Sequence, residues 1–420
     1  MHRWESLKQT MKDFDRRRFL TLTGSAAGFL PLAGLHAANR NSRAANVNPA
    51  QSAIRNYPTL GRTGIRLSDI SFGTSRLRSG QEDLVRHALE RGVNYFDTAD
   101  SYTRGQSERV LGNALREVRD DVFIVSKTQA WNDDRKSIMQ ALEGSLQRLQ
   151  TDYIDVYFNH AVNSLARLQN PEWYEFVELA KRQGKIRFTG ISGHAGRLTQ
   201  CLEYAIEGDL CDVVLVAYNF GQDPAFYAGL TRSFDRIARH PDLPQMLAQA
   251  NAKGIGVVAM KTLMGARLND MRPYENAGNT FSQAAFRWTL SNANVDALVV
   301  SMTSKRDIDE YLAASGADEL ADGDLDLLQG YAKLNGTTFC RQACNDCEGA
   351  CPYGVPIADV LRTRMYAVDY EDVEFARAEY QTLAVNAAAC LGCSGEPCRN
   401  ACSYGLAIDS LCAPTHRILA

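Results

Sequence analysis

The feature of this sequence that most constrains its fold is an eightfold alternation of strand-like and helix-like segments between residue 57 and about residue 315. The predicted strands are rich in β-branched and aromatic residues and begin at Asp69, Asn94, Val122, Ile154, Arg187, Val213, Gly256 and Ala297. Segments of helical period lie between them, at residues 81–91, 107–118, 134–149, 171–182, 245–253 and 281–290. Eight such units in about 250 residues predict a closed parallel (β/α)8 TIM barrel, whereas six would predict a doubly wound sheet.

The chain has 420 residues, which is more than one barrel needs, so further parts are expected on both sides of it. Its composition, 45% hydrophobic and 23% charged residues, is that of an ordinary soluble globular protein. The formal net charge of −3 argues against nucleic acid as the main partner, because phosphate binding needs a basic surface.

The first 38 residues have the organisation of an export signal. Arg16 and Arg17 precede an apolar stretch with small residues, at positions 20–35, that is short for a membrane-spanning helix. The segment resembles a twin-arginine signal, which implies export of the folded protein to the periplasm or cell envelope. An ordinary secretory signal, or an uncleaved anchor that associates the protein with the membrane, is the alternative. Residues 39–55 are predicted to be a linker.

Four polar residues follow the predicted strands at positions suited to catalysis. Asp97 follows the second strand, Lys127 ends the third, His160 ends the fourth, and Tyr102 lies in the loop after Asp97. Because the carboxyl ends of barrel strands open at one mouth, these groups are expected to converge. A nearby ammonium lowers the pKa of a tyrosine from its reference value of about 10, and a carboxylate holds that ammonium in place.

Such a set is suited to giving a proton to a carbonyl oxygen or taking one from an alcohol, with the histidine orienting the carbonyl. Each of the four residues alone is more often a turn, packing or surface residue. Their combination at successive strand ends is what predicts a catalytic site.

The segments around these residues resemble the aldo-keto reductase family. The similar motifs occur in the family's order and are residues 61–64, 72–74, 95–99, 107–112, 145–155, 184–187 and 190–192. The resemblance covers about residues 56–315, and a barrel domain is assigned to residues 56–320. It implies an oxidoreductase that acts on a small carbonyl or alcohol substrate. Tyr102 would be the general acid, Lys127 and Asp97 its tuning pair, and His160 the residue that orients the substrate.

The resemblance also implies a nicotinamide cofactor, NADP or NAD, across the barrel mouth. The positions that would contact it are Gly73, Thr74, Ser192, Lys261, Leu263, Lys305 and Arg306. The chain departs from the family pattern at several cofactor positions: residues 260–263 replace the usual aromatic that stacks on nicotinamide, and the other changes are Gly193 for Asn, Leu215 for Gln, Ser301 for Lys and Asp307 for Arg. An Asp at this place would repel the NADP 2′-phosphate. We therefore expect weaker and less NADP-selective binding than in a typical family member.

Nine of the eleven cysteines lie between Cys340 and Cys412, in two groups of four with one left over. The groups are Cys340, Cys344, Cys347 and Cys351, and Cys390, Cys393, Cys398 and Cys402. Similar phrases follow both groups at an offset of 51 residues, from Pro352 and from Ser403, and so form an internal repeat. A tight cysteine triplet with a distant fourth cysteine before proline is typical of two-cluster ferredoxins.

That resemblance implies two 4Fe-4S clusters with exchanged fourth ligands. Cys340, Cys344, Cys347 and Cys402 would hold one cluster, and Cys390, Cys393, Cys398 and Cys351 the other. A small, mainly helical ferredoxin-like domain is therefore predicted at residues 325–420, with a helical stretch at residues 371–384. Two zinc sites or a disulfide scaffold are the alternatives, and a radical-SAM triplet is disfavoured because the cysteines follow the barrel.

Two functions follow from this organisation. In the first, the barrel converts a carbonyl or an alcohol, and the clusters exchange electrons with a partner protein. In the second, the barrel is catalytically weak and serves as a redox-partner or binding module with structural clusters. The departures from the family pattern at the predicted cofactor contacts motivate this second hypothesis.

Overall fold

The computed structural model describes residues 52–420, apart from residues 130, 223–241, 265–270, 276–278, 336–339, 342–343, 369–371 and 395–396. The predicted export signal at residues 1–38, with Arg16 and Arg17, lies outside the described residues, as does most of the predicted linker. Within the described ranges, no helix is long and apolar enough to cross a membrane.

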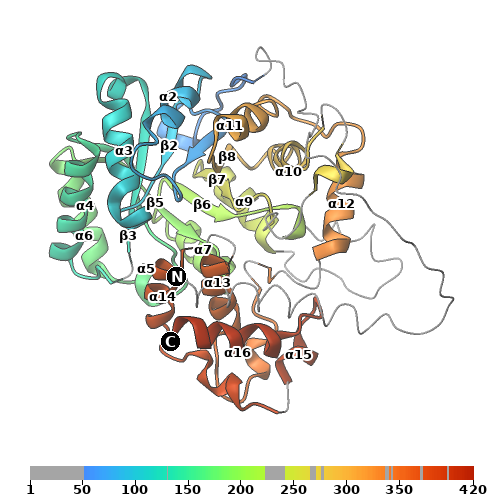
Figure 1. Ribbon diagram of the computed structural model, residues 1–420. Coiled ribbons are helices and arrows are strands. Elements are labelled where there is room, and N and C mark those ends of the chain that lie inside the picture. The colour runs from blue at the N-terminus through green and yellow to red at the C-terminus, as the bar shows by residue number, and fades with distance from the viewer. Residues whose placement is uncertain are drawn as a thin grey trace. The chain divides into compact units, whose positions relative to one another are not determined.

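Eight parallel strands form a closed barrel, which confirms the predicted fold class (Figure 1). They pair in chain order, and β1 closes the barrel on β8 with Ile70 opposite Leu298. Each strand begins within one residue of its predicted start. The strands are β1 Ile70–Gly73, β2 Tyr95–Asp97, β3 Phe123–Thr128, β4 Ile154–Asn159, β5 Ile186–Gly193, β6 Val213–Ala217, β7 Gly256–Met260 and β8 Ala297–Ser301.

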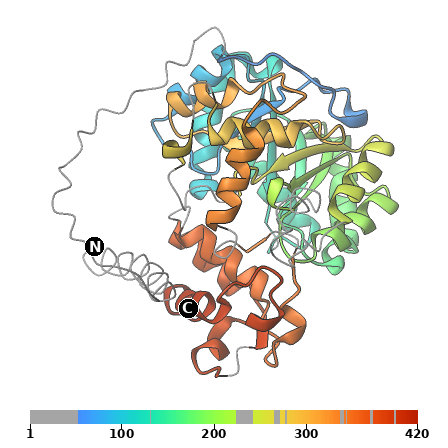
Figure 2. The ribbon, with the colours of Figure 1, turned by 90° about the vertical axis from the view of Figure 1, so that its right-hand side faces the viewer.

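Helices surround the strands, as the predicted alternation requires (Figure 2). They are α2 Glu82–Glu90, α3 Gln106–Leu115, α4 Arg135–Leu149, α5 Leu165–Leu168, α6 Pro171–Arg182, α7 Leu198–Glu207, α9 Asp242–Ala252, α10 Phe281–Leu290, α11 Lys305–Leu312 and α12 Asp324–Asn335. Local signals begin several of them. The carboxylate of Asp134 accepts the backbone N–H groups of Lys136 and Ser137, both at 2.9 Å, and so caps α4.

Two apolar cores hold these layers together. One fills the barrel interior, with Tyr95, Val156 and Phe158 among its buried residues. The other lies between the strands and the surrounding helices and contains residues such as Ile124 and Leu142. This double core explains the apolar strand sequences, because strands of a parallel barrel are covered on both faces.

Buried ion pairs explain two of the family-like motifs. On β4, Asp155 accepts from Arg119 and Arg187, each at 2.8 Å, and from the backbone N–H of Ile124 at 2.9 Å. On α3, fully buried Glu108 accepts from Arg148 at 2.6 Å. Both carboxylates join neighbouring βα units, so these motif residues support the barrel and lie outside the chemistry.

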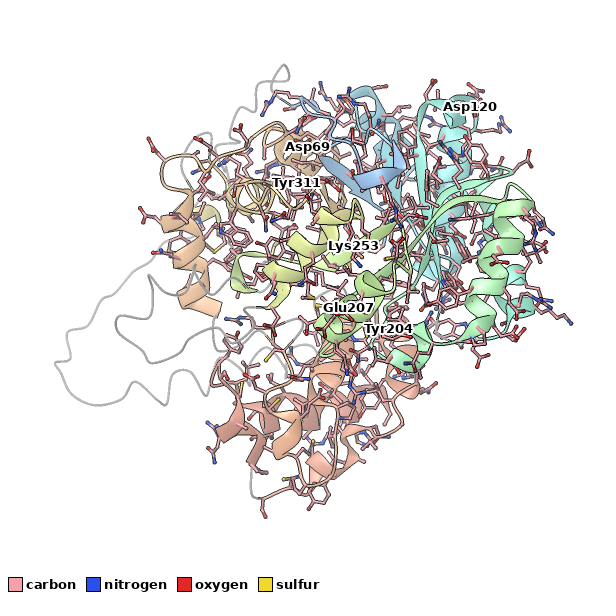
Figure 3. All side chains as sticks on the ribbon, turned by 180° about the vertical axis from the view of Figure 1, so that it is seen from behind. Asp69, Asp120, Tyr204, Glu207, Lys253 and Tyr311 are labelled. Carbon is pink, nitrogen blue, oxygen red and sulfur yellow. The ribbon has the colours of Figure 1, made fainter. Side chains whose placement is uncertain are left out.

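Polar contacts also secure the end of the barrel where the strands begin. Asp69, labelled in Figure 3, accepts from the Ser315 hydroxyl and the Gly316 N–H, each at 2.6 Å. Lys253 donates to the carbonyl oxygens of Ile206 and Glu207 at the end of α7. Cations at a helix C-terminus are favourable because the carbonyl groups there carry partial negative charge.

The C-terminal region is mainly helical, as predicted, and has a core of its own. Its helices are α13 Ile357–Val368, α14 Val373–Gln381, α15 Pro397–Ala401 and α16 Ile408–Leu419. Its buried core includes Val360, Tyr380, Leu406 and the cysteines Cys347 and Cys412. The helix predicted at residues 371–384 is present but shorter, because the Asp372 side chain caps its start at Val373.

Candidate active site

A buried lysine–aspartate pair forms the floor of the barrel mouth. Lys127 on β3 donates from Nζ to Asp97 Oδ1 at 2.7 Å and to the carbonyl oxygen of Thr98 at 2.6 Å. The two side chains are 1% and 6% exposed. Burial raises the pKa of Asp97 and lowers that of Lys127, and the attraction between them opposes both shifts. The barrel thus brings these two predicted residues together.

Tyr102 lies against this pair. Lys127 Nζ is 4.8 Å from the centre of the Tyr102 ring. Tyr102 begins a 3-10 turn, Tyr102–Gly105, in which Thr103 and Arg104 adopt left-handed φ angles of 47° and 59°. Such angles are unfavourable for residues with a Cβ and are concentrated at functional sites. The Thr103 hydroxyl secures the turn by donating to the Leu77 carbonyl oxygen at 2.7 Å.

His160 completes the predicted set. Its ring meets the Tyr102 ring edge-on, with the centroids 5.9 Å apart. The side-chain amide nitrogen of Gln129 is 2.6 Å from His160 Nδ1, so an amide donor there leaves the imidazole proton on Nε2. Burial, followed by the charge of Lys127, lowers the pKa of His160 well below 6.5, and the ring is therefore neutral at physiological pH. Sequence reasoning missed Gln129, whose position at the end of β3 was its one available signal.

The predicted cofactor residues near the mouth lie at the ends of β1, β5 and β7. The buried Ser192 hydroxyl accepts from the Ala161 N–H at 2.9 Å, and the Thr74 hydroxyl donates to the Asp97 carbonyl oxygen at 2.8 Å. A Cβ on Gly73 would lie 3.0 Å from the backbone of Val300, which explains the glycine. Lys261 follows β7 with a left-handed φ of 57°, and Leu263 lies two residues further on.

The structure shows the surroundings of two of the departures from the family pattern. A Cβ at Gly193 would lie 2.6 Å from Leu198 Cδ1 and 3.2 Å from the Val162 carbonyl oxygen, so a larger side chain there requires Leu198 to shift. Leu215 is 2% exposed and packs in the core of the barrel interior. Both positions are therefore closely packed, where the family resemblance implied polar side chains.

Another departure, Asp307, lies near the predicted phosphate-binding end. Lys305 and Arg306 are exposed in the first turn of α11, which Ser304 caps by accepting from the Asp307 N–H at 3.1 Å. Asp307 Oδ2 accepts from the Thr303 hydroxyl at 2.7 Å. Two cations at a helix N-terminus suit a phosphate group, and the engaged Asp307 carboxylate weakens the repulsion expected from the sequence. The residues at the mouth and at α11 therefore fit a nicotinamide dinucleotide.

The C-terminal region also contacts the barrel mouth, which the sequence did not reveal. The Tyr366 hydroxyl on α13 lies 3.0 Å from Nε2 of His194, the residue that follows β5. Asn163 donates to Asp359 Oδ2 on α13 at 3.0 Å, and Arg104 forms an ion pair with Glu374 on α14. Figure 1 shows α13 and α14 beside α5 and α7.

Four cysteines line one cavity in the C-terminal region. They are Cys340, Cys344, Cys347 and Cys402, the set that the ferredoxin resemblance assigned to one cluster. Of the second set, Cys398 lies within electrostatic range of Cys351 and Cys390. The leftover residue, Cys412, is fully buried beside Cys390.

The contacts of these cysteines bear on the two alternatives to iron–sulfur clusters, a disulfide scaffold and zinc sites. None of the eleven cysteines, all within the described ranges, forms a disulfide. Among the described residues, no three His, Cys, Asp or Glu side chains are placed to hold a single metal ion. Burial raises the pKa of Cys344 and of Cys347 to about 12, so both are neutral thiols unless a metal binds.

Comparisons with known proteins agree with the geometry of the barrel. The family model described as "Aldo/keto reductase family" matches residues 69–275. Methylglyoxal reductase YeaE of Escherichia coli (strain K12) is 31% identical over 223 residues, which cover 52% of this chain and 73% of that protein. L-galactose dehydrogenase of Arabidopsis thaliana is 26% identical over 293 residues, 61% of this chain and 86% of the relative.

Solved structures show the same barrel. A thermostable aldo-keto reductase, solved with the inhibitor epalrestat, superimposes with a TM-score of 0.51 at 26% identity, over 66% of this chain and 99% of that one. An aldo-keto reductase of Klebsiella pneumoniae solved with NADPH gives a TM-score of 0.50 at 24% identity, over 67% and 95% of the two chains. Sequence and fold together show that this chain belongs to the aldo/keto reductase family and is an oxidoreductase.

Proposed function

We propose that the barrel interconverts the carbonyl and alcohol forms of a small substrate with NADP(H), and that Tyr102 moves the proton. The observation that carries this proposal is the position of Lys127 Nζ, which Asp97 and the Thr98 carbonyl hold 4.8 Å from the Tyr102 ring. A fixed ammonium at this distance favours the phenolate that remains after proton transfer.

Each side chain has a separate task in this reaction. The nicotinamide, when bound, supplies a hydride to the carbonyl carbon or accepts one from the alcohol. Tyr102 donates its hydroxyl proton to the carbonyl oxygen during reduction and takes it back during oxidation. Neutral His160, with its proton on Nε2, donates a hydrogen bond to the same oxygen and orients it. Lys127 stabilises the charge that Tyr102 acquires.

The cofactor assignment follows from the same positions. Ser192 at the end of β5 would contact the nicotinamide carboxamide, and the tight backbone at Gly73 would let the cofactor approach. Lys305 and Arg306 in the first turn of α11 would bind the 2′-phosphate, where an arginine can contact two oxygens at once. The Klebsiella relative solved with NADPH supports a phosphorylated cofactor.

A direct test compares the purified full chain with its Tyr102→Phe variant in NADPH-dependent reduction of a panel of small aldehydes. We expect kcat to fall about 10²- to 10⁴-fold in the variant while the Kd of NADPH changes little. Tyr204→Phe removes the hydroxyl of an exposed tyrosine on α7 and serves as the control. Equal rates in the wild type and Tyr102→Phe would contradict the proposal.

We also propose that the cysteine cavity holds a 4Fe-4S cluster and that the second cysteine set holds another. Cys340, Cys344, Cys347 and Cys402 meet in one cavity, which supports the first assignment. Thiolates of such a cluster bind different iron atoms, so they need not converge as the ligands of one ion do. Each cluster would carry one electron at a time, whereas the hydride step moves two, so electron exchange with a partner protein would need a further two-to-one-electron carrier. Anaerobically purified protein should be brown and contain about eight iron atoms per chain. A colourless protein with two zinc atoms would overturn the assignment of iron–sulfur clusters.

A second candidate function is that of a binding module with a weak barrel. One relative, a protein of rice named probable voltage-gated potassium channel subunit beta, is 24% identical over 312 residues. The packing that replaces two polar cofactor contacts at Gly193 and Leu215 favours this candidate. The absence of any NADPH or NADH binding in calorimetry would support it over the first.

Residues 1–38 are proposed to direct twin-arginine export to the periplasm or cell envelope. The Arg16-Arg17 pair before an apolar stretch is the supporting observation. Fractionation of cells that produce the full chain tests this. We expect the wild type outside the cytoplasm and an Arg16→Lys/Arg17→Lys variant inside it. Equal distribution of the two would contradict the proposal.

A further inference from the structure

A buried cation lines the cysteine cavity of the C-terminal region. Arg341, the residue after Cys340, is 3% exposed and lines this cavity together with the four cysteines assigned to the first cluster. Its guanidinium carbon lies 4.4 Å from the centre of the Tyr404 ring. An aromatic face stabilises a cation that is removed from water. The guanidinium group is therefore held in an enclosed position beside the proposed iron ligands.

The other residues of the cavity strengthen the effect of this charge. Apolar side chains contribute much of the lining, among them Ile357 and Leu406. Charges interact more strongly in such surroundings than in water, and Arg341 lies within electrostatic range of Cys340 and Cys344.

A carboxylate opposes the arginine in the same cavity. Asp346 also lines it, but this side chain is half-buried and accepts a hydrogen bond from the Ser403 hydroxyl. Arg341 and Asp346 thus act on the cysteines with opposite signs. Because Arg341 is the more buried of the two, water screens its charge less.

The second cysteine set has different residues at the corresponding positions. Leu391 follows the first cysteine of that set, as Arg341 follows Cys340, and is 47% exposed. Tyr353 stands 51 residues before Tyr404 in the internal repeat and is 56% exposed. The repeat by itself therefore does not require a buried arginine on an aromatic ring. This arrangement is particular to the first set, which favours a role specific to that site.

We propose that Arg341 makes the first cluster easier to reduce than it would be without this charge. The inference rests on the proposed iron–sulfur clusters, because they supply the group that is reduced. A one-electron donor adds one negative charge to a cluster that four thiolates already hold. An enclosed, apolar site disfavours the added charge, and a fixed guanidinium group beside it offsets part of that penalty.

An anaerobic redox titration of the full chain tests this proposal without turnover. Mediators set the potential, and electron paramagnetic resonance measures the reduced fraction of each cluster. The signal that is lost in Cys344→Ser identifies the first cluster. At the wild-type midpoint of that cluster, Arg341→Gln should lower the ratio of reduced to oxidised cluster about tenfold, which corresponds to about 59 mV for a one-electron step. Arg341→Lys should keep most of the ratio, because it keeps the charge.

Asp346→Asn tests the sign of the effect, because it removes a negative charge from the same cavity. It should raise the ratio about two- to fivefold, a smaller change because the side chain is half-buried. Arg377→Gln is the matched control, since it removes the same charge as Arg341→Gln from an exposed position on α14. It should leave the ratio unchanged. Shifts in the same direction for Arg341→Gln and Asp346→Asn would indicate a general disturbance of the site and overturn the proposal.

The iron content separates the failure of this proposal from the failure of the clusters. A wild type without iron would refute the clusters themselves. A wild type with about eight iron atoms, and an unchanged ratio in Arg341→Gln, would leave the clusters standing and refute the role of Arg341. Where Arg341→Gln loses the first cluster, Arg341→Lys decides: full iron and a normal ratio support the role of the charge. Loss of iron from Arg341→Lys as well would show that the shape of the side chain matters and would overturn the proposal.

Discussion

The barrel mouth and the cysteine cavity are built on different principles. At the mouth, protein groups satisfy one another: Lys127 donates to Asp97 and Thr98, and Gln129 contacts His160. In the cavity, Cys344 and Cys347 are buried thiols whose pKa burial raises to about 12. The groups of the first site satisfy one another by charge and hydrogen bonding, whereas the thiols of the second would ionise only if the proposed cluster binds.

This difference has an energetic consequence. The barrel site draws its stability from strand pairing and from two apolar cores, so its geometry does not depend on a ligand. The C-terminal core includes Cys347 and Cys412, so the thiols are part of the packing there. Metal binding to such a region contributes directly to its folding free energy.

The largest expected effect comes from the lysine at the mouth. Lys127→Met should lower kcat/KM about 10²- to 10⁴-fold, because the phenolate of Tyr102 loses its ammonium. It should also lower the melting temperature, since Asp97 is left buried and unpaired. The double variant Lys127→Met/Asp97→Asn should recover the melting temperature but not the activity. Recovery of both would show that the pair is structural.

The next effect tests the dependence of the C-terminal region on metal. Cys344→Ser should remove about half of the roughly eight iron atoms and lower the unfolding temperature of this region. NADPH affinity should change little, because the barrel holds its own geometry. Cys201→Ser, a change at a buried cysteine on α7, is the control and should keep all the iron. Full iron content in Cys344→Ser would contradict the expectation that the cysteine cavity, unlike the barrel mouth, depends on a bound metal.

A smaller effect concerns cofactor choice at α11. Arg306→Ala should weaken NADPH binding about tenfold and leave NADH binding nearly unchanged, because only NADPH carries the 2′-phosphate. Asp307→Asn should strengthen NADPH binding by a factor of about two to five, because it removes repulsion at a half-buried site. Fluorescence titration of both cofactors measures these changes. A wild type that prefers NADPH strongly, with submicromolar affinity, would contradict the weak selectivity expected from the sequence.

The smallest effect is a pH dependence at the mouth. Burial, followed by repulsion from Glu108, raises the pKa of Asp100 to about 7, against about 3.9 in an unfolded chain. Between these values the folded chain retains a proton that the unfolded chain releases, so this carboxyl makes stability fall as pH rises from about 4 to 7.

Asp100→Asn should remove that slope. The melting temperature of the variant minus that of the wild type should be about 2–4 °C higher at pH 8 than at pH 4.5. Asp83→Asn, at an exposed position on α2, should show no such difference between the two pH values. Parallel behaviour of the two variants would show that Asp100 ionises normally.

Much of the barrel was predictable because its signals are local. Each strand is a short run of β-branched or aromatic residues. The C-terminal ends of parallel barrel strands lie at one mouth, so Asp97, Lys127 and His160 could be predicted to lie together. Gln129 lies at the same strand ends but has no distinctive chemistry, so only its contact with His160 revealed it. The contact between His194 and Tyr366 could not be predicted, because 172 residues separate them in the chain.

The C-terminal region was predictable in its ligand sets and not in its placement. Spacing grouped Cys340, Cys344 and Cys347, and the ferredoxin resemblance added Cys402, which does line the same cavity. No local pattern indicated that Tyr366 on α13 would contact the barrel, because a contact between distant segments depends on their complementary surfaces. The export signal and the clusters themselves remain predictions.

The most direct test of the account follows the hydrogen that the mouth is proposed to transfer. The full chain is incubated with a small aldehyde and NADPH deuterated at C4 on the transferable face, in ordinary water, and the alcohol is analysed by mass spectrometry. We predict one deuterium on the former carbonyl carbon of the wild-type product, and about 10²- to 10⁴-fold less labelled alcohol from Tyr102→Phe in the same time. An unlabelled alcohol, or equal amounts of labelled alcohol from the two proteins, would contradict the claim that Tyr102, Lys127, Asp97 and His160 form a hydride-dependent catalytic site.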